Sequence, residues 1–244
     1  MTRVRRTGAA AGLLLALLVL LTVTVAVRHG APLPGDRALH HWPLAHRPPV
    51  AVATARAITA TGTGVVPYVL AVVAGLIAGR GRKGRRYAVA GVLAVLALGQ
   101  VVRYGLMAAV ARPRPAAVDW ATTASGHSFP SGHTTTSALT AGLLAWAVVT
   151  RSGRSAARPT IAVLSLWAVA VGLSRVYLGV HWASDVLGGW LFASLWLCLA
   201  ALATTPGVLI VRRRGAEPSA RAAGTDPDAT APPGGGNSRD IQAG

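Results

Sequence analysis

Long apolar runs alternate with short polar segments along most of the chain. A membrane-spanning helix needs about 20 apolar residues, because about 30 Å of hydrocarbon offers no partner for an unpaired backbone amide. Six runs meet this requirement, at residues 8–27, 65–79, 87–110, 134–150, 160–176 and 186–211. The second run is short and contains Pro67, so we expect its span to begin earlier, within residues 59–63. The pattern predicts an all-α fold, a six-span transmembrane helical bundle.

The segments outside these runs are polar or rich in proline. Residues 28–57 are proline-rich and predict an outer loop that ends in a short interfacial helix. This loop holds a cluster of histidines without supporting carboxylates, so we expect a solvated loop and no metal site there. Its members are His29, His40, His41 and His46. Residues 215–244 lack apolar periodicity and cannot bury enough surface to offset ordering entropy. We therefore predict a membrane domain at residues 1–214 and a disordered cytoplasmic tail at residues 215–244.

The composition excludes an ordinary soluble domain. Of the 244 residues 52% are hydrophobic and only 13% are charged, and aromatic residues make up 5%. The net charge of +17 would indicate a nucleic-acid partner in a soluble protein. Here the basic residues lie between apolar runs, so the prediction is membrane lipid as partner and no nucleic acid. The single cysteine, Cys198, lies in an apolar run and excludes a disulfide framework and a cysteine-based metal cage.

The distribution of basic residues predicts the orientation in the membrane. Two thirds of the 24 Lys and Arg residues fall before the first span, in the loops around Lys83 and Arg154, and after the last span. Cytoplasmic loops keep such an excess, so we expect both termini in the cytoplasm of a multi-pass plasma-membrane protein. The basic residues before the first run resemble a secretory signal, but the run is long and lacks a clean cleavage site, which favours a retained anchor.

Among the seven acidic residues, Asp185 differs because it lies at the start of an apolar run, whereas the others fall in loops or the tail. A carboxylate is costly to bury there and is usually retained for function. His181 lies four residues earlier, on the same face of a helix. The carboxylate can accept the proton of one imidazole nitrogen and leave the other nitrogen as a nucleophile. The alternative is a helix-capping aspartate near a surface histidine.

Further polar motifs lie on the same predicted outer face. These are Arg112-Pro113-Arg114-Pro115, Pro130-Ser131-Gly132-His133 and Ser174-Arg175, which precedes His181 by a fixed interval. Guanidinium groups match phosphate oxygens, and a helix start with glycine offers backbone amides to the same anion. Two histidines then suffice for phosphoester cleavage through a phosphohistidine. This chemistry requires no metal and no cofactor.

These motifs resemble those of the type 2 phosphatidic acid phosphatases, which share their active site with vanadium-dependent haloperoxidases. The family pattern is Lys-x6-Arg-Pro, Pro-Ser-Gly-His and Ser-Arg-x5-His-x3-Asp, and the resemblance covers about residues 102–189. It implies that His181 is the nucleophile, Asp185 its orienting partner and His133 the acid for the leaving oxygen. The same resemblance implies phosphate contacts from Arg114, Arg175, Ser131 and Gly132.

One position departs from the family pattern. Seven residues before Arg114 the chain has Met107 where the family has lysine, and counting from Arg112 leads to Gly105. Arg103 lies one turn before Met107 on the same helix face. We therefore expect Arg103 to replace the missing lysine as a phosphate-binding residue. Without it, one phosphate contact is lost.

The resulting hypothesis is an integral membrane lipid phosphate or diphosphate phosphatase with its active site at the extracytoplasmic ends of spans three to six. A cluster at the ends of spans suits a phosphate whose tail stays in the bilayer. Undecaprenyl diphosphate, phosphatidic acid and phosphatidylglycerophosphate all fit this interpretation. The alternatives are a vanadate-dependent haloperoxidase, whose known members are soluble and larger, and a non-catalytic lipid-phosphate-binding protein with a decayed site, supported only by Met107. The sequence makes no prediction of the oligomeric state.

Overall fold

The computed structural model describes residues 2–204, which form helices and loops without strands. The helices are α1 (Thr2–Val27), α2 (Asp36–Ala45), α3 (Pro49–Ala60), α4 (Val65–Ala78), α5 (Gly81–Val110), the 3-10 turn η1 (Ala117–Asp119), α6 (Gly132–Tyr177) and α7 (Ala183–Ala203). The predicted end of the last span at residue 211 and the predicted boundary at residue 214 lie outside the described residues.

The all-α prediction is confirmed for the described part of the chain. Four helices there, α1, α5, α6 and α7, are long and apolar enough to cross a membrane, and the bent pair α3 and α4 would make a fifth span. Large apolar side chains such as Leu13 and Leu20 are exposed on α1, as lipid contact requires. The number of six spans stays a prediction.

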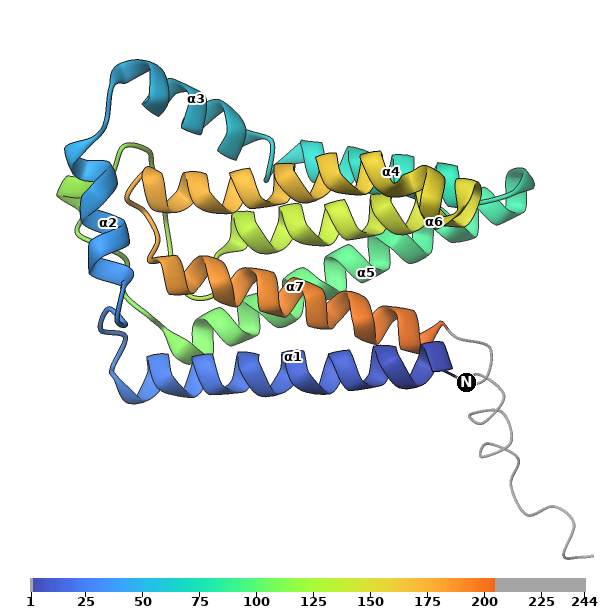
Figure 1. Cartoon of the computed structure of the whole chain (residues 1–244), viewed down its shortest axis with the longest axis horizontal. Helices are drawn as coiled ribbons and strands as arrows, with labels where there is room; N and C mark the ends of the chain where they lie inside the picture. Colours follow the sequence, from blue (N-terminus) through green and yellow to red (C-terminus); the bar gives the residue numbers. More distant parts are fainter. Residues whose placement is uncertain (1, 205–244) are drawn as a thin grey trace, which may run out of the picture. The chain divides into compact units, whose positions relative to one another are not determined.

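Helix α6 is interrupted at Gly153, whose φ of 77° and ψ of 166° do not belong to a helix. A straight helix of 46 residues would be about 69 Å long, more than twice the thickness of the hydrocarbon. At Gly153 the positive φ suits glycine, and the chain reverses direction there, at the right of Figure 1. The two halves of α6 therefore form a helical hairpin.

The long helices pack through small and aliphatic side chains. Helix α1 packs against α7, α4 packs against α5 and α6, and α6 packs against α7. A Cβ atom at Gly75 of α4 would collide with the backbone of Val89 in α5, so glycine permits the close approach of these helices. One core cluster joins Ala71, Leu96, Leu139 and other residues of α4, α5, α6 and α7.

The proline-rich segment of residues 28–57, for which the sequence predicts an outer loop, is more ordered than expected. It contains the helices α2 and α3, and α2 crosses the ends of the long helices at the left of Figure 1. Asp36 and His40 of α2 are buried, and His40 Nε2 lies 2.9 Å from an oxygen of Asp119. The prediction of a solvated loop is therefore wrong for these two residues, because carboxylate, imidazole and guanidinium partners compensate their burial.

The second predicted span also differs in detail. Helix α4 begins at Val65, and α3 ends at Ala60 with a bend of 48° between the two helices. Gly64 at the junction has a φ of 66°, a conformation that stops the helix. Of the predicted extension, residues 59–60 therefore belong to the end of α3, and residues 61–63 lie in the turn between the two helices.

Candidate functional site

A cavity of about 640 Å³ contains most of the residues that the sequence analysis selected. Its polar lining comes from α4 and the turn before it, from α5 and α6, and from the loops before α6 and α7. The selected residues in the lining are Arg103, Met107, Arg114, Gly132, His133, Arg175 and His181. We call His133, Arg175 and His181 the α6–α7 wall, and Gln100, Arg103 and Met107 the α5 wall. Motifs far apart in the chain therefore meet around one space.

His181 and Asp185 form the predicted pair at the start of α7. The Asp185 carboxylate is fully buried, and its Oδ2 lies 3.4 Å from His181 Nδ1 and accepts the backbone amide of Trp182 at 2.9 Å. Asp185 therefore caps α7 and contacts the histidine at the same time. The alternative of a surface histidine is wrong, because His181 is 1% exposed.

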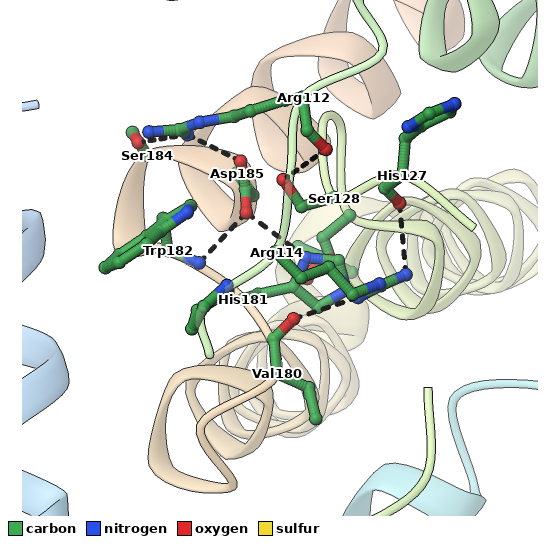
Figure 2. Close-up of polar contacts among 12 residues, drawn as sticks. Arg112, Arg114, His127, Ser128, Val180, His181, Trp182, Ser184 and Asp185 are labelled. Atoms are coloured by element: carbon green, nitrogen blue, oxygen red, sulfur yellow. Dashed lines mark hydrogen bonds and ion pairs between the residues drawn. The ribbon is translucent and has the colours of Figure 1, made fainter. Parts of the chain in front are cut away.

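The contacts of His181 assign its tautomer. Nη1 of Arg114 donates to Nε2 of His181 at 2.9 Å (Figure 2). A guanidinium cannot accept a hydrogen bond, so Nε2 carries the lone pair and Nδ1 carries the proton. Burial lowers the pKa of His181 to about 4; Asp185 opposes this shift, while Arg114 and Arg175 add to it. The imidazole is neutral at pH 7, the state that a nucleophile requires.

Arg114 uses all five of its N–H groups on protein acceptors. Besides His181, it donates to the backbone oxygens of Val180, Ser125, Gly126 and His127, at 2.8 to 3.1 Å. Burial lowers the pKa of Arg114. This arginine thus holds residues 125–127 against the start of α7, and a phosphate that it binds must displace some of these contacts.

The start of α6 presents two of its three selected residues to the cavity. Gly132 and His133 line it, whereas Ser131 is fully buried behind them. The Ser131 amide donates to the backbone oxygen of Asp185 at 3.1 Å, and its hydroxyl accepts from Thr134 at 3.0 Å. Ser131 therefore joins the starts of α6 and α7 here. The predicted phosphate contact of its amide would require that bond to open.

Arg175, at the end of α6, reaches the cavity from the opposite arm of the hairpin. Its Nη1 donates to the hydroxyl of Thr59 at 3.0 Å. Its Nε is buried without a partner among the described residues. An unpaired buried donor is costly, so this guanidinium has capacity for an anion.

The α5 wall brings Arg103 to the place where the sequence lacks a lysine. Arg103 Nε donates to Gln100 at 2.9 Å, and the Gln100 amide donates to the Thr136 hydroxyl at 2.9 Å. A Cβ atom on Gly132 would lie 3.4 Å from Cζ of Arg103, so the guanidinium contacts the start of α6. Its Nη1 lies 3.6 Å from the Met107 sulfur.

Two further residues, for which no role is predicted from the sequence, lie next to the His181–Asp185 pair. Arg112 is fully buried and contacts both Asp185 and Asp36. The Arg-Pro-Arg-Pro motif drew attention to Arg112, but no local pattern indicated that Asp36 lies next to it. Within residues 2–204 no group of three or more His, Cys, Asp and Glu side chains is arranged to hold a metal ion.

Comparison with known proteins shows a similar sequence over part of the chain and a similar fold. The PAP2 superfamily model matches residues 88–206. Phosphatidylglycerophosphatase B of Bacillus subtilis is 40% identical over 67 residues, which are 27% of this chain and 33% of that relative, so the match spans a third of its length. The crystal structure of a transmembrane PAP2-type phosphatidylglycerolphosphate phosphatase from Bacillus subtilis is 26% identical, with a TM-score of 0.67 over 78% of this chain and 94% of that chain. The chain is a membrane protein that matches the PAP2 superfamily over residues 88–206 and has the fold of a transmembrane PAP2-type protein.

Proposed function

We propose that the chain is a membrane lipid phosphatase that hydrolyses a phosphomonoester or diphosphate through a phosphohistidine. One observation carries this proposal. His181 lines a cavity that also contains arginines, and its tautomer places the lone pair on Nε2. Asp185 behind the ring stabilises the positive charge that develops when Nε2 attacks. The similarity to PAP2-type phosphatases supports the same reaction class.

The reaction has two steps. Nε2 of His181 forms a bond to phosphorus while the bond from phosphorus to the leaving oxygen breaks, and His133 gives its proton to that oxygen. Water then attacks the phosphohistidine, His133 takes a proton from the water, and the phosphorus–nitrogen bond breaks. His133 is suited to both steps because it lines the same cavity as His181.

Arginines would bind the phosphate before the attack. Arg175 and Arg103 each retain N–H groups near the cavity, and Gly132 lets the anion approach the start of α6. Arg114 would exchange its bond to His181 for one to a phosphate oxygen, which frees Nε2 at the moment of binding. This exchange couples substrate binding to release of the nucleophile.

We further propose that the cavity faces outward in a plasma-membrane protein with cytoplasmic termini. The support is the excess of Lys and Arg around Lys83 and Arg154. Cysteine labelling from outside, with Cys198 replaced, should modify Thr122→Cys and leave Lys83→Cys unmodified. The reverse pattern would invert the orientation.

The decisive experiment is release of phosphate from defined lipids by the purified protein. The panel contains phosphatidylglycerophosphate, phosphatidic acid and undecaprenyl diphosphate. The first is the leading candidate, because the similar Bacillus protein is a phosphatidylglycerophosphatase. Turnover should survive EDTA and fail in His181→Ala, while His41→Ala, outside the cavity, should behave as wild type. A wild type that binds these lipids without hydrolysing them would favour the non-catalytic alternative, and halide oxidation with vanadate would favour the haloperoxidase.

A further inference from the structure

A buried charge network lies behind the His181–Asp185 pair and extends into the outer segment. Nη1 of Arg112 contacts Oδ1 of Asp185 at 2.6 Å, and Nη2 contacts Oδ2 of Asp36 at 2.9 Å. The side chains of Arg112 and Asp185 are fully buried, and that of Asp36 is 2% exposed. Figure 2 shows Arg112 reaching toward Asp185 and Ser184. The network therefore joins α2 to the start of α7.

Asp36 also holds the first turn of α7 directly. Its Oδ1 accepts the Ser184 amide at 2.9 Å, and its Oδ2 accepts the Ser184 hydroxyl at 2.6 Å. The neighbouring residue, Asp185, is the one that contacts His181. A shift of Asp36 would therefore move the carboxylate that orients the imidazole.

The charges of the network explain why two carboxylates are needed. Arg112 alone would neutralise Asp185, leaving little negative charge to stabilise a positively charged His181. Asp36 supplies a second negative charge to the same guanidinium. The two carboxylates and the guanidinium therefore carry a net charge of −1 in a buried region without water. Electrostatic interactions are strong there because little water screens them.

We propose that Asp36, acting through Arg112, is a positioning residue that fixes Asp185 and preserves its charge for His181. This inference rests on the proposed phosphatase activity. It assigns a part in the reaction to the outer segment, which lies far from the family motifs in the sequence. Asp36 does not itself line the cavity, so it acts on the pair and not on the substrate.

The test is a double-mutant cycle on phosphate release from phosphatidylglycerophosphate. Asp36→Asn should lower kcat by roughly 10- to 100-fold with little change in KM, by analogy with the loss found when the partner that orients a metal-binding histidine is removed. Arg112→Gln should also lower kcat. Asp36→Asn keeps one side-chain oxygen for Ser184, so the change acts mainly on the charge that Arg112 senses. The double variant should therefore be no slower than Arg112→Gln alone, which is a non-additive result.

The pH dependence separates a charge effect from a merely structural one. Arg112→Gln leaves two carboxylates unopposed, so the pKa of His181 should rise and the acid limb of kcat/KM should move toward neutral pH. Adding Asp36→Asn should move this limb back. The other charged or titratable groups around His181 stay the same in all variants: Asp185 of α7, Arg114 of the loop before α6, and Arg175 and His133 of α6.

Asp119→Asn is the matched control, because the Asp119 carboxylate also anchors α2, through His40, without touching Arg112. It should retain kcat within about threefold, a change below 1 kcal/mol. The double variant loses one positive and one negative charge, so the network keeps its net charge of −1 on Asp185. It therefore keeps the test available if a single variant, which changes the buried charge, does not fold. A normal kcat in the double variant would overturn the inference. Additive losses with an unmoved acid limb would overturn it as well. A wild type without phosphatase activity would instead overturn the proposed function, and this inference with it.

Discussion

The α6–α7 wall and the α5 wall face the same cavity, but only the first has its polar residues at the positions of the family pattern. The α6–α7 wall carries His133, Arg175 and His181 at the positions of the family pattern. The α5 wall has Met107 at the lysine position and brings in Arg103 from one turn earlier, held by Gln100. A positive group thus reaches the same region from a different backbone position.

The difference teaches which parts of such a site have fixed positions. A nucleophile must meet phosphorus along one line, so the backbone positions of His181 and Asp185 leave little freedom. A cation that stabilises spread negative charge can approach from several directions, and a long arginine side chain covers the length of a helical turn. We therefore expect substitutions in the α6–α7 wall to cost more than those in the α5 wall.

The largest effect is expected for His181→Ala. Without Nε2 no phosphohistidine forms, and turnover should fall by about 1,000-fold or more, a barrier increase above about 4 kcal/mol. Rapid acid-quench with a radiolabelled substrate should trap phosphoenzyme in wild type and none in the variant. Normal turnover in His181→Ala would contradict the assignment of the nucleophile.

His133→Ala should reduce turnover by about 100- to 10,000-fold, the range of general acid–base catalysis. The loss should be largest for poor leaving groups, because only these need a proton in the transition state. The comparison uses a lipid phosphate and an activated aryl phosphate with the same variant. Equal losses for both substrates would remove His133 from the role of acid.

Arg103→Ala tests the α5 wall. Loss of one charge-stabilising donor should raise the barrier by about 2 to 4 kcal/mol. Met107→Lys should partly rescue this variant, because the two side chains lie on one helix face and would serve the same phosphate oxygen. The measurement is phosphate release by wild type, both single variants and the double variant. A loss below about threefold in Arg103→Ala would end the substitution hypothesis.

The smallest effect is expected for Gln100→Leu. Gln100 touches Arg103 and Thr136 but forms no part of the α6–α7 wall, so its loss should cost about 1 kcal/mol through a less constrained guanidinium. The effect should disappear in the Arg103→Ala background. A loss that persists there would show that Gln100 has a separate role.

The sequence predicts the long helices and the gathering of the motifs for simple reasons. Apolar runs must become helices in lipid, and fixed spacing places His181 and Asp185 on adjacent turns. The sequence does not predict contacts that depend on folding at long range. Asp36 meets Arg112 across 76 residues and Ser184 across 148, and four of the Arg114 acceptors are backbone oxygens, which every residue type has. No side-chain pattern marks such contacts.

The hairpin of α6 sets limits on insertions that composition alone would not reveal. His133 begins one arm and Arg175 ends the other, so both face the cavity only if each arm keeps its rotational phase. Each residue advances an α-helix by about 100°, so one inserted residue within an arm would turn either His133 or Arg175 away from the cavity while leaving the arm equally apolar. The turn around Gly153 has no such phase to keep, because the helical geometry is already broken there. Evolution can therefore insert residues at the hairpin turn without moving the residues of the cavity. Within either arm, the number of residues is fixed.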